Sequence, residues 1–177
     1  MSPETTDAIV RWTARGAVAC YLLRVVIDLQ LPGREKRLGL MRAARNIWTW
    51  GCVLFLIHFL SAFALVHHFD HGDAYAHTAR RTAEVVGLHW GGGIYVNHAF
   101  MIFWICDVLR WWKLGADAGY QPDRYFWSVH GFFAFMFVNA TIVFGPPHWL
   151  WISAFILVLL GIVAFAGKRP ADSAPIS

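Results

Sequence analysis

The chain has 177 residues, of which 58% are hydrophobic, 16% aromatic and only 15% charged. A soluble domain carries roughly 25% charged residues, so this composition excludes an ordinary soluble domain and indicates an integral membrane protein. The net charge of +4 does not indicate nucleic-acid binding, because the basic residues lie between apolar segments, where they report membrane topology.

Five apolar stretches follow one another along the chain, at residues 15–31, 47–66, 94–112, 126–144 and 149–166. Each is close to the ~20 residues needed to cross ~30 Å of hydrocarbon. We therefore predict an all-α integral membrane protein, an antiparallel bundle of five transmembrane helices. Residues 1–169 are expected to form one polytopic membrane domain, and residues 170–177 a polar C-terminal tail.

The 15 Lys and Arg residues predict the orientation. Those following spans one, three and five outnumber those on the opposite side ten to four, and Arg24 lies inside span one. By the positive-inside rule, the N-terminus lies outside and the C-terminus in the cytoplasm, which fits a bacterial inner membrane. The larger group is Arg34, Lys36, Arg37, Arg42, Arg45, Arg110, Lys113, Arg124, Lys168 and Arg169; the smaller is Arg11, Arg15, Arg80 and Arg81.

Aromatic residues are expected at both membrane boundaries, as in other membrane proteins. Trp48, Trp50, Trp111, Trp112, Tyr125 and Trp127 fall near the predicted cytoplasmic boundary, and Trp12, Trp90 and Tyr95 near the other. An aromatic belt of this kind explains the ten tryptophans without a ligand.

Two spans carry opposite charges at helical spacing. Arg24 and Asp28 in span one are four residues apart and can pair on one face, although this segment could instead lie along the interface. Asp107 and Arg110 in span three are expected to pair near the boundary, and the alternative is that Asp107 relays protons or binds a quinone. The basic segment 34–45 is predicted to be partly helical at the lipid surface.

The only long loop covers residues 67–93 on the outer side, and we expect an interfacial helix there over residues 74–86. Gly91, Gly92 and Gly93 predict a flexible entry to span three. Gly145, Pro146 and Pro147 predict a tight turn between spans four and five.

Three histidines, His58, His98 and His130, lie inside apolar stretches, which makes each a functional-site hypothesis by default. At 1.5 Å per residue, His58, Asn97, His98 and Asn139 share the outer half of the membrane at depths of roughly 8–13 Å, whereas His130 lies roughly 22 Å deep. These five residues are our candidate cofactor site, for haem b with imidazole ligands or for a quinone. The alternative is that the histidines are neutral packing residues.

His58 carries the sharpest of these expectations. Gly51, Ser61 and Ala62 share its helix face, and such small residues leave room for a flat group or for close helix approach. A buried polar group needs a hydrogen-bond partner. We expect His58 to face the interior of the bundle, and we expect His98 or Asn139 to lie no further from it than the width of a cofactor.

A second candidate site lies in the outer loop, which is dense in histidine and aspartate. His67 and His71 are four residues apart, as are Asp73 and His77, and such pairs on one helix face can bind zinc, copper or iron. The alternative is a solvated loop in which histidine and aspartate pair with each other. The candidate metal ligands are His67, His68, Asp70, His71, Asp73, His77 and His89.

These features leave three functions open, and whether the protein is an enzyme stays open with them. The first is a membrane redox or metal-binding protein, such as a cytochrome-b-like or quinone-interacting subunit passing electrons to a partner. The second is a cofactor-free accessory subunit of a larger membrane complex. The third is a small membrane enzyme with a metal in the outer His/Asp cluster.

Overall fold

The computed structural model describes residues 2–29, 34–116 and 124–166, and this part of the chain is helical with no β-strand. The predicted all-α class is therefore confirmed. Six α-helices follow in order: α1 (Pro3–Leu29), α2 (Arg34–Ser61), α3 (His71–Val86), α4 (Gly93–Leu114), α5 (Arg124–Val138) and α6 (His148–Ala166). Short π-helical turns extend two of them, η1 (Ala62–Val66) after α2 and η3 (Asn139–Val143) after α5.

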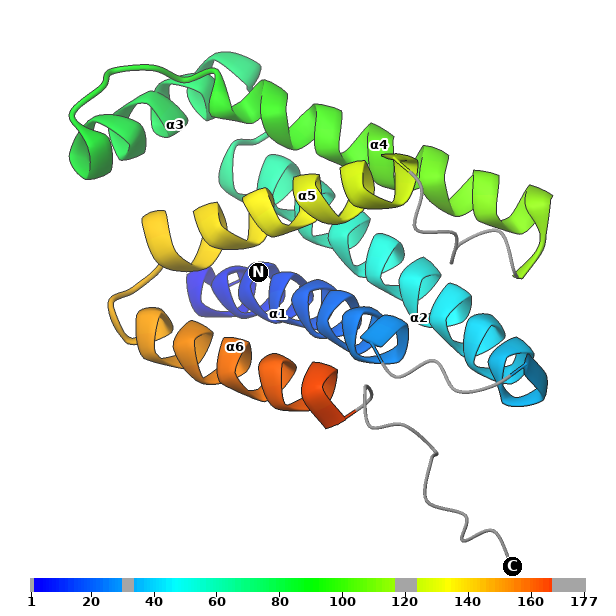
Figure 1. Cartoon of the computed structure of the whole chain (residues 1–177). Coiled ribbons are helices and arrows are strands. Elements are labelled where there is room, and N and C mark those ends of the chain that lie inside the picture. Colours follow the sequence, from blue (N-terminus) through cyan, green and yellow to red (C-terminus); the bar gives the residue numbers. More distant parts are fainter. Residues whose placement is uncertain (1, 30–33, 117–123, 167–177) are drawn as a thin grey trace, which may run out of the picture.

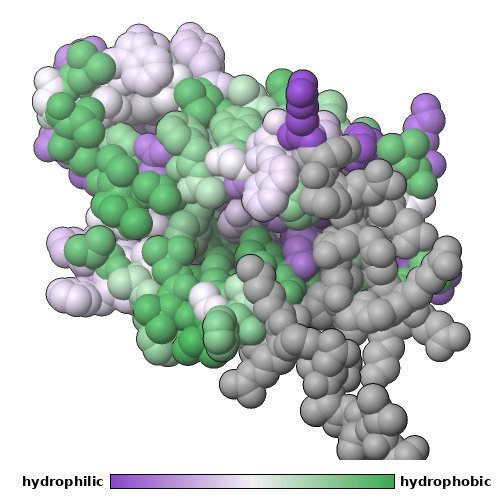
Figure 2. Space-filling view, viewed as in Figure 1, coloured by the Kyte–Doolittle hydropathy of each residue, from purple (hydrophilic) through white to green (hydrophobic). Residues whose placement is uncertain are grey.

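Three helical segments in the described residues are long and apolar enough to cross a membrane: Leu38–Val66, Arg124–Val143 and His148–Phe165. They correspond to the predicted spans two, four and five. Figure 2 shows hydrophobic side chains over the outer surface of α6, in keeping with lipid contact. The expected spans one and three correspond to α1 and α4, which carry charged residues and are not among these segments.

The five long helices lie side by side, and α3 lies beyond one end of them (Figure 1). α1 and α2 pack antiparallel, since His58 contacts Val10 whereas Gly51 faces Cys20. α2 and α4 are also antiparallel, because Thr49 bonds to Trp112 and Phe59 packs on His98. The buried core between the helices is Ala17, Ala44, Trp48, Cys52, Phe100, Trp104, Trp111, Val129 and Phe133.

Two helices continue beyond their apolar stretches. α1 begins at Pro3, well before residue 15, and the basic segment predicted to be only partly helical is the continuous first part of α2. Polar residues end an apolar run without ending a helix, because backbone hydrogen bonds do not depend on side-chain polarity. The predicted C-terminal tail lies outside the described residues.

Local signals explain how α3 begins and ends. The Asp70 carboxylate accepts hydrogen bonds from the backbone N–H groups of Gly72 and Asp73, which is an N-cap. Gly87 ends the helix with φ of 75°, a left-handed conformation that favours glycine. The expected helix at 74–86 is thus present and starts one turn earlier.

The glycines at the turns before α4 and before α6 are needed for close backbone approach. A Cβ on Gly91 would clash with the Tyr75 carbonyl oxygen, and one on Gly145 would clash with that of Thr141. The first contact seats α3 on the start of α4, so this segment is a close-packed junction between helices. The second makes the predicted tight turn before α6.

Candidate functional site

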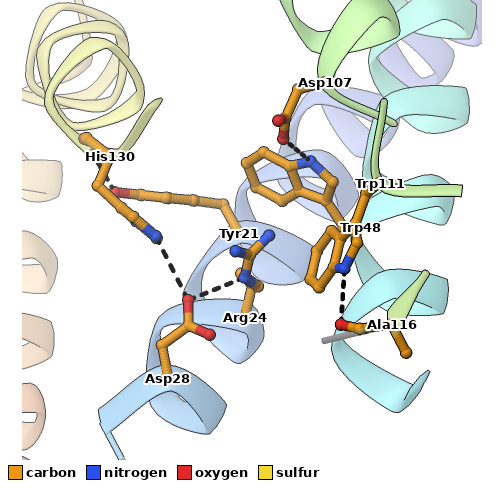
Figure 3. Close-up of polar contacts among 8 residues, drawn as sticks. All are labelled: Tyr21, Arg24, Asp28, Trp48, Asp107, Trp111, Ala116 and His130. Atoms are coloured by element: carbon orange, nitrogen blue, oxygen red, sulfur yellow. Dashed lines mark hydrogen bonds and ion pairs between the residues drawn. The ribbon is translucent and has the colours of Figure 1, made fainter. Parts of the chain in front are cut away.

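A buried ion pair lies inside the bundle on α1. The Arg24 Nε–H donates to Asp28 Oδ2 at 2.8 Å, and the two side chains are only 3% and 7% exposed. The predicted pairing of these residues is confirmed. From α5, His130 Nε2 lies 3.3 Å from the same Asp28 oxygen, and the Tyr21 hydroxyl donates to the His130 carbonyl at 3.4 Å (Figure 3).

A second carboxylate, Asp107 of α4, accepts a hydrogen bond at each of its oxygens. The Trp48 indole N–H donates to its Oδ2 and the Tyr125 hydroxyl to its Oδ1, both at 2.8 Å. Arg110 lies further away, at 3.9 Å, so the predicted Asp107–Arg110 pair is present but is not the main contact. With both oxygens occupied, Asp107 serves as a structural anchor between α2, α4 and α5.

Arg24 joins the two clusters. Its guanidinium carbon lies 4.9 Å from the centre of the Trp48 ring and 4.1 Å from that of Trp111. These cation–π contacts are strongest when the charge is removed from water. The network thus ties α1, α2, α4 and α5 together, which accounts for two buried charges near the C-terminal end of α1.

The burial of Trp48 and Trp111 corrects the expected aromatic belt. Both indoles are almost fully buried between helices, while Trp50, Trp112 and Trp127 of the same group are exposed. Small residues one turn before and one turn after Trp48 on α2, Ala44 and Cys52, share its buried face. Small residues four positions before and after a tryptophan indicate that it faces a neighbouring helix. The prediction of an aromatic belt considered only the depth of each aromatic residue in the membrane and therefore did not use this signal.

Spare hydrogen-bonding capacity in this network lies between α1 and α5. Among the described residues, Asp28 Oδ1 and His130 Nε2 are buried and make no hydrogen bond of good geometry. Of the predicted cofactor residues, His130 is therefore the one placed beside a buried charge. Its partner, Asp28, was not predicted as a candidate.

His58 has a hydrogen-bond partner, as required, but a different one from those expected. Its Nδ1 lies 2.9 Å from the carbonyl oxygen of Val10 on α1. A carbonyl only accepts, so Nδ1 carries the proton and Nε2 keeps its lone pair. The sequence missed Val10 because span one was counted only from residue 15.

The room beside Gly51 is filled by protein. A Cβ there would lie 2.8 Å from Trp104 Cζ2 and 2.9 Å from Cys20 Cβ. Small residues near His58 were expected either to leave room for a flat bound group or to allow close helix approach. At Gly51 the structure shows close helix approach, with the Trp104 indole occupying the space.

The other outer residues of the predicted cofactor site bond locally. His98 Nδ1 donates to the Ile94 carbonyl of its own helix at 2.7 Å, and Asn139 Nδ2 donates to the Phe135 carbonyl at 2.8 Å. Asn97 is exposed. Within the described residues, no hydrogen bond or ring contact joins His58 to His98, Asn97 or Asn139.

The outer loop brings together His67, Asp73 and His77. The Nδ1 of His67 lies 2.7 Å from Asp73 Oδ2, and the ring centres of His67 and His77 are 5.3 Å apart. Burial, followed by the neighbouring His67 and Arg80, lowers the pKa of His77, while the His67 hydrogen bond lowers the pKa of Asp73. At neutral pH the group is thus a carboxylate beside imidazoles, and His77 is neutral.

The remaining loop candidates are dispersed. His71 lies beside His98, with ring centres 5.7 Å apart, whereas His68 and His89 are exposed. The Asp70 carboxylate caps α3. In the described part of the chain, no group of three or more His, Cys, Asp or Glu side chains lies close enough to hold a metal ion.

No family model, curated protein or solved structure matches this chain. The geometry above therefore carries the functional argument alone.

Proposed function

We propose that the chain is a five-span membrane protein that binds a transition metal at its outer end, with His67 and His77 as ligands. The N-terminus then lies outside and the C-terminus in the cytoplasm of a bacterial inner membrane. The observation that supports the site is the close approach of two imidazoles from different elements, one of which, His67, is hydrogen-bonded to the Asp73 carboxylate.

The geometry of this contact suits metal binding. Metal–nitrogen bonds of about 2.0–2.1 Å place the ring centres of two imidazoles on one tetrahedral metal about 5 Å apart. The 5.3 Å between His67 and His77 fits this spacing. Because Asp73 accepts from His67 Nδ1, the Nε2 lone pair is left for a metal, and a carboxylate behind a histidine raises its basicity.

Two imidazole ligands would leave coordination positions for water or a substrate. Imidazole suits zinc, copper and iron alike, so the ligand type does not select among them. A metal with open positions supports either electron transfer or metal-assisted hydrolysis. The redox function and the small-enzyme function therefore share one site, and metal identity separates them.

Metal analysis tests this proposal. Protein purified without chelators and incubated with zinc, copper or ferrous iron is expected to hold one of them stoichiometrically. The double variant H67L/H77L should lose it, whereas H148L, which replaces an exposed histidine at the start of α6, should not. Wild-type protein that retains no metal under these conditions would contradict the proposal.

A second candidate, a haem b or quinone site inside the bundle, is favoured by the tautomers of His58 and His98. Each has Nδ1 bonded to a backbone carbonyl, so each keeps the Nε2 lone pair that axial ligation requires. An optical spectrum of the purified protein, oxidised and reduced, tests for haem. H58L should abolish the Soret band and H148L should preserve it; a colourless native protein would exclude haem.

The third candidate, a cofactor-free accessory subunit, is favoured by the outward-facing side chains of α6. Trp151 and Phe165 are 78% and 72% exposed, and only 6% of this apolar helix is buried inside the bundle. Such a surface fits lipid or the helix of another subunit. A native complex that contains this chain but is both colourless and metal-free would support this candidate over the other two.

A further inference from the structure

Basic side chains without a carboxylate gather at the end of the bundle where α2 begins and α4 ends. Arg42, Arg45 and Lys113 form no ion pair with any described residue. Of the four basic residues at the opposite end, Arg11 is paired with Asp7 at 2.8 Å and Arg81 with Glu84 at 2.9 Å, whereas Arg15 and Arg80 form no ion pair with a described residue. Within the described residues, the positive charge of Arg42, Arg45 and Lys113 is therefore not balanced by a carboxylate.

Arg45 is held in a fixed orientation within this group. Its guanidinium lies over the ring of Trp112, with 3.8 Å between the guanidinium carbon and the ring centre. The Trp112 indole N–H donates to the Thr49 hydroxyl at 2.9 Å, and that hydroxyl donates to the Arg45 carbonyl at 2.8 Å. Stacking and these two bonds lock Arg45, Thr49 and Trp112 into one unit across α2 and α4.

The free edge of this guanidinium is available to a ligand. Arg45 Nε is buried and makes no hydrogen bond to the described residues, and among those residues no ion pair engages its two terminal nitrogens. They form the planar fork that matches two oxygens of one phosphate. Arg42 precedes Arg45 by three residues on α2, and Lys113 follows Trp112 on α4, so two further exposed cations lie on the same two helix ends.

The depth of Arg45 in the bilayer indicates that the phosphate belongs to a lipid headgroup and not to a soluble anion. Val66, at the end of the apolar segment of α2, lies 21 residues further along, a rise of about 30 Å. This equals the thickness of the hydrocarbon core. With Val66 at one boundary, Arg45 and the half-exposed Trp112 lie at the other, at the level of the lipid headgroups.

We infer that Arg45, with Arg42, Lys113 and Trp112, binds the phosphate of an anionic phospholipid. Arg45 supplies the two parallel hydrogen bonds and the other cations supply charge. Trp112 provides an apolar surface beside the glycerol and acyl chains. A zwitterionic lipid brings its own cation into this basic region, which disfavours it.

Lipid titration of the purified protein tests the inference. Protein in an uncharged detergent is titrated with phosphatidylglycerol and, in parallel, with phosphatidylcholine, and bound lipid is counted by native mass spectrometry. Wild-type protein is expected to prefer phosphatidylglycerol. R45Q should weaken that binding about fivefold, since one basic residue near a membrane surface contributes about that factor.

Two further variants separate a built site from diffuse charge. R81Q removes one positive charge from the opposite end and is expected to leave the affinity unchanged. R45K keeps the charge but loses the planar fork and the stacking, so it should lose most of the preference. Circular dichroism shows whether each variant is folded. If R45Q does not fold, R45K still tests the inference.

Three results would overturn the inference. Equal losses in R45Q and R81Q, or an R45K variant that binds like the wild type, would show that only net charge matters. Displacement of phosphatidylglycerol by inorganic phosphate would show that the site takes a soluble anion.

Discussion

Arg24 and Asp28 show how a charged residue can be retained in an apolar helix. Each alone would be costly to bury, but their direct bond and the two indoles around Arg24 replace the lost water. Such a pair adds little net stability compared with apolar residues. Its contribution to the arrangement of the helices comes from the contacts of Arg24 with Trp48 on α2 and Trp111 on α4.

Replacing Asp28 with asparagine is expected to destabilise the fold. The change keeps the side-chain shape but removes the carboxylate that balances Arg24, at a cost of about 3–5 kcal/mol. Reversible unfolding in mixed micelles measures it. The matched control is D7N, which breaks an ion pair of the same length and spacing that is mostly exposed, and which should leave stability unchanged. Equal stability of D28N and the wild type would contradict this account.

The outer histidine group predicts a pH response of α3. The pKa of His77 is lowered from its usual 6.5, so the unfolded helix binds a proton more readily and stability falls as the pH drops below 6.5. The pKa of Asp73 is lowered from 3.8, so its contribution is present above pH 3.8 and is lost as the pH falls through the lowered value.

Hydrogen exchange of the α3 amides, corrected for intrinsic rates, measures this response. Protection should be greatest above pH 6.5 and should decrease in two steps on acidification. H77Q is expected to remove the first step and D73N the second. Protection that does not change between pH 7 and pH 3 would show that neither group is linked to the stability of α3.

At the level of helices, the bundle depends on close approach between α1, α2 and α4. Gly51 lets the Trp104 indole and Cys20 meet on the surface of α2, and Gly16 accepts Leu54 in the same way. Small residues allow backbones to approach closely where water does not drive helices together. The aromatic core is therefore stacked directly against the α1–α2 pair.

Enlarging Gly51 is expected to separate these helices. Gly51→Leu overpacks the contact with Trp104 and should cost about 1–3 kcal/mol. Gly131→Ala on α5 is the matched control, because no atom lies within 4 Å of a Cβ at that position. It should be neutral or stabilise the helix by about 0.5–1 kcal/mol. Unfolding of both variants in the same micelles gives the comparison, and a neutral Gly51→Leu would contradict the packing described.

For the whole molecule, α1 and α4 decide the topology. Both run beside segments that are apolar enough to span, and Arg24, Asp28 and Asp107 have buried side chains. An isolated helix with Arg24 and Asp28 would not enter a bilayer easily, but one whose charges face protein can. We therefore retain five spans as the topology to be tested.

Reporter fusions test that topology directly. A reporter after Lys168 should read cytoplasmic, and one in the loop after Gly87 should read extracytoplasmic, because the basic residues divide ten to four. Matching readings at both positions would exclude an odd number of spans between them. An extracytoplasmic reading after Lys168 would show that either the helix count or the orientation is wrong.

The sequence by itself determined the helical class, the apolar segments and the Arg24–Asp28 pair. It also determined the helix within residues 67–93 and the tight turn before α6. These depend on composition and on spacings of a few residues, which chain geometry translates directly into structure. The tertiary structure decided the rest: the carbonyl that binds His58, the residue beside His130, the burial of Trp48 and the meeting of His67 with His77. Each joins residues on different elements, and no local spacing encodes which helix faces will meet.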